Sequence, residues 1–93
     1  MLESTIQANI LDYLNGLNGC IAENVCDVQR DRADINCCYN GVYYRIEVKS
    51  LEHNNKATVG QRINLKRWSK CGAICFIAYS LEDVKAMINV EKI

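Results

Sequence analysis

RADINCCYNGVYYRIEVKS, residues 32–50, holds an Asn-Gly pair between two runs in which apolar and polar side chains alternate. Such a pair between alternating runs is the strongest short-range signal for a β-hairpin with a two-residue type I′ loop. With Asn40 and Gly41 as the loop, we expect strands over residues 32–39 and 42–50 to pair antiparallel. One face of this hairpin is apolar enough to pack on a core: Ala33, Ile35, Cys37, Tyr39, Val42, Tyr44, Ile46 and Val48.

The opposite face of the hairpin is polar and contains two carboxylates. In the same register Asp34 lies directly across from Glu47, and directly opposed residues hold their Cβ atoms about 4.5–5.5 Å apart. Lys49 is two residues beyond Glu47 and therefore points to the same face, where Arg32 lies across from it. The register thus predicts two acids and a lysine side by side.

Length and composition describe one small domain. Ninety-three residues suffice for a single modest core, and 49% apolar with 24% charged residues is an ordinary globular composition. No apolar run approaches the ~20 residues that span a bilayer, so we expect no membrane partner. The first residues, MLESTIQAN, show neither the basic nor the apolar region of a secretion signal, so we expect a cytoplasmic protein.

The six cysteines and the single histidine, His53, do not form a common zinc pattern. Because no export signal accompanies the cysteines, we expect free, buried thiols rather than disulfides.

Net charge is zero, which argues weakly against a nucleic-acid partner, but six basic residues and one acidic residue lie in the stretch from Lys49 to Lys70. A basic stretch beside an acidic cluster can attract a phosphate backbone and hold a cation against it.

Hydrophobic periodicity predicts the other elements. Thr58 and Gln61 form a capping box at the start of the second helix. The expected order is α-β-β-β-α-β-α, an α/β protein with a mixed sheet flanked by helices. The last strand is a continuous apolar run, which suits a strand covered on both faces. Besides the hairpin, we expect helices over residues 2–15, 58–70 and 81–89 and strands over residues 20–28 and 73–79.

Two further features, a set of four basic residues and the single residue Glu3, allow two interpretations each. The four bases in and before the second helix, Lys56, Arg62, Lys66 and Lys70, form either a solvated face or a surface for DNA phosphates. Glu3 is either an acid in a first helical turn, favoured by the helix dipole, or part of the rim of a site on which the helix packs. Residue pattern alone does not decide between them.

The polar face of the hairpin suggests metal-assisted chemistry. Two adjacent carboxylates repel unless a cation lies between them, and Mg²⁺ takes oxygen ligands such as Asp34, Glu47 and the backbone carbonyl of Val48. Lys49 beside them would hold or deprotonate a water, which suits phosphodiester hydrolysis. The plainer alternative is a solvent-exposed face of weak cross-strand ion pairs. Glycosidase-type catalysis is less attractive because few aromatic residues are present to build a sugar cleft.

Asp34, twelve intervening residues and Glu47-Val48-Lys49 resemble the D…(D/E)xK motif of the PD-(D/E)xK nucleases, which have a restriction-endonuclease-like core. A longer pattern is similar to the virus-type replication-repair nuclease (VRR-NUC) family: E-x-x-I from Glu3, A-D-I and I-E-V-K-S in the hairpin, and Q-x-x-x-L-x-x-W-x-x-x-G from Gln61. The resemblance covers nearly the whole chain, so residues 1–93 look like a stand-alone single domain, as in phages. One departure is visible, since residues 31–33 read DRA where the family often has Gly-x-Pro.

The resemblance implies a Mg²⁺- or Mn²⁺-dependent DNA endonuclease of a bacterium or a phage-infected cell. The family's acidic residues fall on Asp34, Glu47 and Glu3, its lysine on Lys49 and its glutamine on Gln61. The resemblance also implies a homodimer that cuts branched DNA, with four-way junctions a candidate substrate, because two symmetric cuts need two sites related by a twofold axis. Two alternatives stay open: a DNA-binding or assembly subunit that keeps the fold without cutting, and a restriction-type nuclease on linear DNA.

Overall fold

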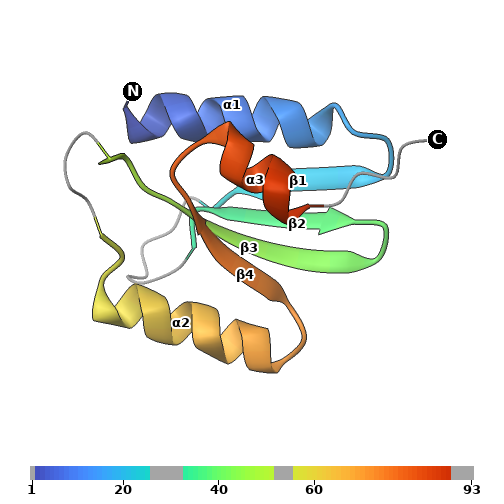
Figure 1. Ribbon diagram of the computed structural model, residues 1–93. Coiled ribbons are helices and arrows are strands. Elements are labelled where there is room, and N and C mark those ends of the chain that lie inside the picture. Colours follow the sequence, from blue (N-terminus) through green and yellow to red (C-terminus); the bar gives the residue numbers. More distant parts are fainter. Residues whose placement is uncertain (1, 26–32, 52–55, 89–93) are drawn as a thin grey trace.

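The structure is a computed structural model that describes residues 2–25, 33–51 and 56–88. Its helices and strands follow the predicted order α-β-β-β-α-β-α (Figure 1). None of the helices in the described ranges is long and apolar enough to cross a bilayer. The elements are α1 Glu3–Asn15, β1 Cys20–Asn24, β2 Ile35–Tyr39, β3 Val42–Val48, α2 Val59–Lys70, β4 Ile74–Ala78 and α3 Leu81–Met87.

The register of the hairpin is the one that the Asn-Gly pair predicts. Tyr39 pairs with Val42 across the loop, and Asn40 and Gly41 have φ angles of 50° and 80°. Both angles lie in the left-handed region that a type I′ loop requires. The loop therefore fixes which residues of β2 and β3 face each other.

The strands are shorter than predicted, and at β2 the cause is visible. Continuing the ladder would direct the Val48 N–H to the carbonyl of Ala33. Instead the Asp34 side chain accepts this bond at 2.8 Å, so β2 begins at Ile35. The β1 strand ends at Asn24, and the rest of its predicted range after residue 25 lies outside the described residues, as does Arg32, which we expected across from Lys49.

The sheet has strand order β1-β2-β3-β4, with β1, β2 and β3 antiparallel and β3 parallel to β4. Helices α1 and α3 lie on one face and α2 lies on the other (Figure 1). The core fills the α1 side, where Ile6, Ile10 and Leu14 of α1 pack on the predicted apolar face of the hairpin. Leu2, which precedes the first turn of α1, and Met87, the last residue of α3, are exposed.

Strand β3 is covered on both faces, because the core lies on one side and α2 on the other. On the α2 side, the charged side chains of β3 and just beyond its end are almost fully buried: Arg45 is 2%, Glu47 2% and Lys49 7% exposed. The alternative of a solvent-exposed face with weak ion pairs is therefore wrong. Alternation along the strand separated the two faces correctly but did not show that a helix covers the polar one.

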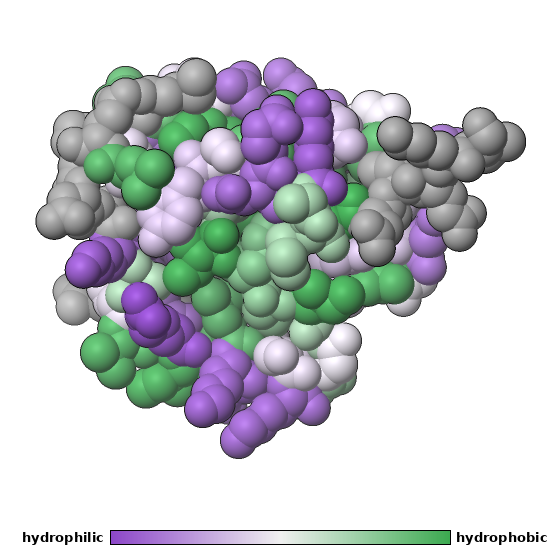
Figure 2. Space-filling model, in the orientation of Figure 1, coloured by the Kyte–Doolittle hydropathy of each residue, from purple (hydrophilic) through white to green (hydrophobic). Residues whose placement is uncertain are grey.

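Strand β4 is an edge strand, and the prediction that both of its faces are covered is wrong. Ile74 is 38% exposed, and Cys75, Phe76 and Ile77 are half-buried. Figure 2 shows a largely hydrophobic strip over β4, between α3 and α2. A continuous apolar run is typical of a central parallel strand, but here it forms the margin of the sheet.

The cysteines described by the structure are free, as predicted, but not all are buried. Cys20 and Cys37 are buried, Cys75 is half-buried, and Cys38 and Cys71 are exposed. Cys26 lies outside the described residues.

The loop conformation can be tested by adding one methyl group. We expect Gly41→Ala to lower the free energy of unfolding by about 1–2 kcal/mol, the cost of a Cβ in the left-handed region. A Cβ at Gly41 would meet no atom within 4 Å, so the loss reflects backbone conformation alone. Urea unfolding followed by circular dichroism measures it. The matched control is Gly16→Ala, because Gly16 has a φ of −82°; equal losses in both variants would contradict the proposed loop.

Candidate active site

Asp34 lies immediately before β2 and directs its carboxylate toward β3. Its Oδ2 accepts a hydrogen bond from the backbone N–H of Val48 at 2.8 Å, and its backbone carbonyl accepts one from Val25 at 2.7 Å. One step beyond the last pair of the β2–β3 ladder, Asp34 is across from Glu47. The hairpin therefore brings the two predicted acids together.

Glu47 and Lys49 lie at the end of β3, on the face of the sheet that α2 covers. Glu47 Oε1 is 3.5 Å from Lys49 Nζ and accepts a hydrogen bond from Gln61 Nε2 at 2.9 Å. The backbone N–H of Lys49 donates to the carbonyl of Ala78 at 3.0 Å, which ties the end of β3 to the end of β4. Four predicted residues, Asp34, Glu47, Lys49 and Gln61, thus meet in one place.

Gln61 belongs to the site and to the start of α2 at once. Its side-chain Oε1 accepts from the backbone N–H of Thr58 at 2.9 Å, and its own backbone N–H donates to Thr58 Oγ1 at 3.1 Å. This is the predicted capping box. The remaining Nε2 group donates to Glu47, so the helix cap holds the amide in position.

Glu3, the predicted residue on the first helix, lies beside the end of β3. Its Oε1 accepts a hydrogen bond from the backbone N–H of Ser50 at 3.3 Å, and Ser50 is buried. The first turn of α1 is therefore joined to the chain one residue beyond Lys49. Ser50 ends the I-E-V-K-S motif, but sequence analysis assigned it no role, because only the folded chain brings its amide to Glu3.

The surroundings of the Glu47 carboxyl group disfavour its negatively charged form. Burial raises its pKa to about 8; the negative charge of Asp34 adds to the rise, and Lys49 opposes it. Glu47 Oε2 is buried, and no donor among the described residues hydrogen-bonds to it, although the Glu47 and Asp34 carboxyl groups are close enough to share a hydrogen bond when one of them is protonated. An ionised carboxylate with one unsatisfied oxygen beside a second acid is costly, and a cation at this oxygen would remove the cost.

The donor set fits Mg²⁺ or Mn²⁺. Proteins often hold Mg²⁺ through one or two carboxylates, with waters and substrate phosphates as further ligands, and Asp34 and Glu47 provide two. Within the described ranges no three histidine, cysteine, aspartate or glutamate side chains converge as a metal group, so Glu3 does not complete a three-acid cluster with them. Direct ligation by Glu3 and by the Val48 carbonyl stays a prediction.

The predicted DNA-binding residues are all exposed. Arg62, Lys66 and Lys70 follow one another at four-residue spacing along α2, and Lys56 lies shortly before the helix. The Arg62 Nε group donates to the carbonyl of Ala57 at 3.4 Å. A DNA-phosphate surface along these residues stays a prediction. Figure 2 shows hydrophilic side chains over α2, at the lower edge of the molecule.

Pattern analysis missed one charged residue beside the site, Arg45. Its guanidinium is 4.1 Å from the ring centroid of Trp68, and Trp68 stacks on Tyr43. The alternation of Tyr43, Arg45, Glu47 and Lys49 on one face of β3 was the available signal. It shows that Arg45 shares the face of the acids.

The element order and the sheet define the class of fold. A four-stranded mixed sheet with helices on both faces, in the order α-β-β-β-α-β-α, matches a restriction-endonuclease-like nuclease fold. No family model matches the chain, and no curated protein matches it in sequence.

A solved structure described as a "VRR_NUC domain protein" has the same fold. The two structures superpose with a TM-score of 0.74 at 15% sequence identity, over 92% of this chain and 84% of the other. The predicted resemblance to the VRR-NUC family is thus confirmed for the fold. At this identity the likeness does not extend to activity.

The buried charge of Glu47 predicts a pH-dependent effect of one substitution. Without metal, Glu47→Gln should become more stable relative to wild type as the pH rises from about 5 to about 9. Folding raises the Glu47 pKa from 4.5 to about 8, so folded wild type keeps a proton that the unfolded chain releases, and its stability falls across this interval. The amide does not titrate and still offers an oxygen to Gln61.

Urea unfolding in EDTA at several pH values measures this difference. The control is Glu82→Gln, since the side chain of Glu82 is 80% exposed and should show a nearly flat profile. A Glu47→Gln difference that does not change with pH would contradict the assignment of a buried, costly charge.

Proposed function

We propose that this protein is a Mg²⁺- or Mn²⁺-dependent DNA endonuclease that hydrolyses phosphodiester bonds. The observation that carries the proposal is the meeting of the half-buried Asp34 with the buried Glu47 and Lys49, beside a carboxylate oxygen of Glu47 that accepts no hydrogen bond from the described residues. Ionisable groups buried together in this way are costly to fold and are typical of functional sites. The fold shared with a solved structure described as a VRR_NUC domain protein supports phosphodiester cleavage as the chemistry we propose.

Each residue of the cluster has a role in this proposal. Asp34 and Glu47 would hold a divalent cation, which when bound polarises a phosphoryl oxygen and lowers the pKa of water. Lys49 orients the attacking water and stabilises negative charge that develops on the phosphate. Phosphoryl transfer needs positioning and charge stabilisation more than covalent help, so this small set of groups suffices.

Gln61 acts through Glu47 and is a positioning residue. Its donated hydrogen bond occupies Glu47 Oε1 and leaves Oε2 free for a cation. The cap on α2 keeps the amide from turning away.

The DNA backbone would lie along four exposed basic side chains, those of Lys56, Arg62, Lys66 and Lys70. Contacts of such side chains with phosphates position the DNA but do not read its sequence. The substrate we propose is branched DNA, cut by a homodimer, with four-way junctions a candidate. The described residues contain one cluster of this kind, so two symmetric cuts need two chains.

Removal of the lysine tests the activity directly. Lys49→Ala should lower Mg²⁺-dependent cleavage by about 10²- to 10⁴-fold, the range for losing a group that moves or orients a proton. The matched control is Lys85→Ala, because Lys85 lies on α3 and pairs only with the exposed Glu82 among the ion pairs described. Cleavage of labelled four-way, flap and linear duplexes with and without EDTA is the measurement.

The other outcomes discriminate between the remaining functions. Equal cleavage by wild type and Lys49→Ala would remove the mechanism. Salt-dependent DNA binding without any Mg²⁺-dependent product would indicate a binding subunit. Cutting of linear DNA at one sequence would indicate a restriction-type enzyme.

The two roles of Gln61 can be separated by a pair of variants. Thr58→Ala removes the capping side chain and should cost about 1 kcal/mol of stability, while the Gln61–Glu47 contact can still form. Gln61→Ala removes the cap and the contact. We expect both variants to be destabilised in urea unfolding, and only Gln61→Ala to lose most of its cleavage rate. Equal rates in the two variants would show that Gln61 matters only for the helix.

A further inference from the structure

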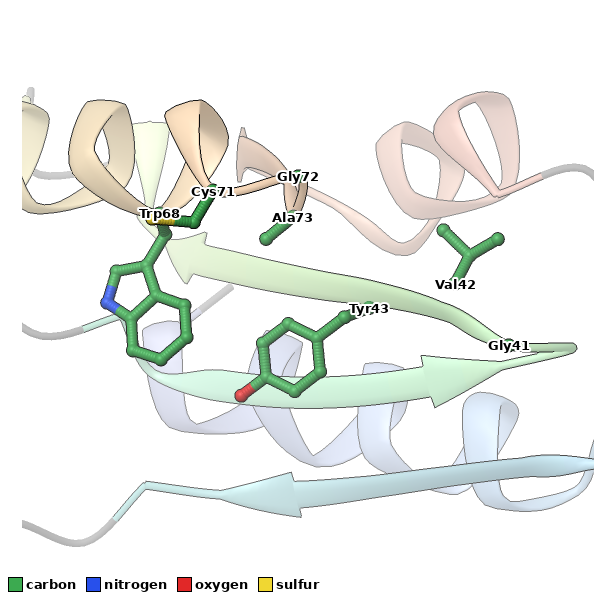
Figure 3. A pocket seen from close by; sticks show the side chains of 7 residues that line it. All are labelled: Gly41, Val42, Tyr43, Trp68, Cys71, Gly72 and Ala73. Carbon is green, nitrogen blue, oxygen red and sulfur yellow. The ribbon is translucent and has the colours of Figure 1, made fainter.

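The α2-facing side of the sheet carries an aromatic surface away from the acids. Tyr43 of β3 and Trp68 of α2 have ring centroids 5.8 Å apart and planes only 21° apart, and both side chains are half-buried. Figure 3 shows the two rings side by side, between the end of α2 and the start of β3. We call this pair the aromatic platform.

The platform borders open space on two sides. A hollow of about 370 Å³ lies between it, the hairpin loop at Gly41 and the turn after α2 at Gly72, two residues that contribute no side chains. A second hollow of about 260 Å³ shares Tyr43 and continues over β1 and β2 toward Ile21 and Cys38, both of which are exposed. Helix α2 therefore covers the acids but leaves these rings accessible.

One buried basic side chain contacts the platform, and two more lie in the same helix turn as Trp68. The Arg45 guanidinium lies 4.1 Å from the Trp68 ring centroid, is 2% exposed, and has two nitrogens, Nε and Nη2, without a hydrogen-bond partner among the residues that the structure describes. Arg67 and Lys70 belong to the same last turn of α2. Flat aromatic side chains next to arginine and lysine are the combination that binds single-stranded nucleic acid: nucleobases stack on the rings, and the positive charges contact the phosphates.

The platform shares its strand face with the proposed cutting site. Tyr43 and Glu47 are four residues apart on β3, which separates their backbones by about 13 Å at 3.3 Å per residue. That distance equals about four nucleotide steps at ~3.4 Å each, or fewer steps of a more extended strand. One strand of DNA can reach both places.

We propose that Trp68 and Tyr43 stack an unpaired nucleobase of the DNA strand whose phosphate lies at Asp34 and Glu47. In a duplex the faces of each base are covered by its neighbours, so only an unpaired or extruded base can use the platform. This inference rests on the proposed function and deepens it. The substrate class becomes DNA with unpaired nucleotides a few positions from the cut.

Trp68 is the only tryptophan of the chain, so its fluorescence reports on the platform directly. The full-length protein is titrated in EDTA with three oligonucleotides of equal length: a single strand, the same strand with abasic sites throughout, and a duplex. We expect the normal single strand to quench Trp68 fluorescence, and the abasic strand to bind at least about 5-fold more weakly. Equal affinity for normal and abasic strands, or unchanged fluorescence at saturation, would overturn the proposal.

Variants give a second, independent measurement by anisotropy of the labelled strand. Trp68→Ala and Tyr43→Ala should each bind the normal strand about 5- to 100-fold more weakly, and their affinity for the abasic strand should stay near that of wild type. Trp68→Phe and Tyr43→Phe keep a ring and should bind nearly as wild type. Tyr13→Ala, on α1 at the other face of the sheet, is the control, and circular dichroism shows that each variant is folded.

The remaining outcomes separate this inference from the nuclease activity. Cleavage without quenching would keep the proposed function and overturn the platform. Quenching without Mg²⁺-dependent cleavage would keep the platform as a strand-binding surface and overturn the nuclease. Fluorescence that changes with protein concentration alone would show that a second copy covers these rings, which also overturns the proposal.

Discussion

A buried carboxyl group held beside a second acid is the constraint on which the rest of the structure depends. Glu47 is almost fully buried and Asp34 is half-buried next to it, and an unconstrained chain would separate two such acids, because they repel when both are ionised. The two-residue loop at Asn40 and Gly41 prevents this by fixing the register. The surrounding groups then compensate in part: the Val48 amide bonds to Asp34, and Lys49 and Gln61 both approach Glu47.

Much of this arrangement could be predicted from the sequence, because it follows from local rules. An Asn-Gly loop sets the pairing, and alternation of period two assigns Asp34, Glu47 and Lys49 to one face. The capping box at Gln61 likewise marks a helix start within four residues. The fold class followed from element order, and the shared fold of a VRR_NUC domain protein confirms it.

What could not be predicted concerns contacts between distant segments. Alternation shows that Arg45 shares a face with Glu47, but not that α2 covers that face and buries the guanidinium against Trp68. The apolar run of β4 shows that it packs on something, but not that it stands at the margin of the sheet. Glu3 carries a helical signal only, and its bond to the Ser50 amide depends on how α1 crosses the sheet.

The amide of Gln61 links the beginning of a helix to the state of the acids, and this has a consequence for local motion. Helix ends fray more readily than helix middles, since their backbone groups depend on caps. When the first turn of α2 unwinds, the side chain that bonds to Thr58 also leaves Glu47. Because burial is the main cause of the raised Glu47 pKa, unwinding that lets water reach this carboxyl group would lower its pKa, so the order of one helical turn and the charge of the acidic centre are coupled.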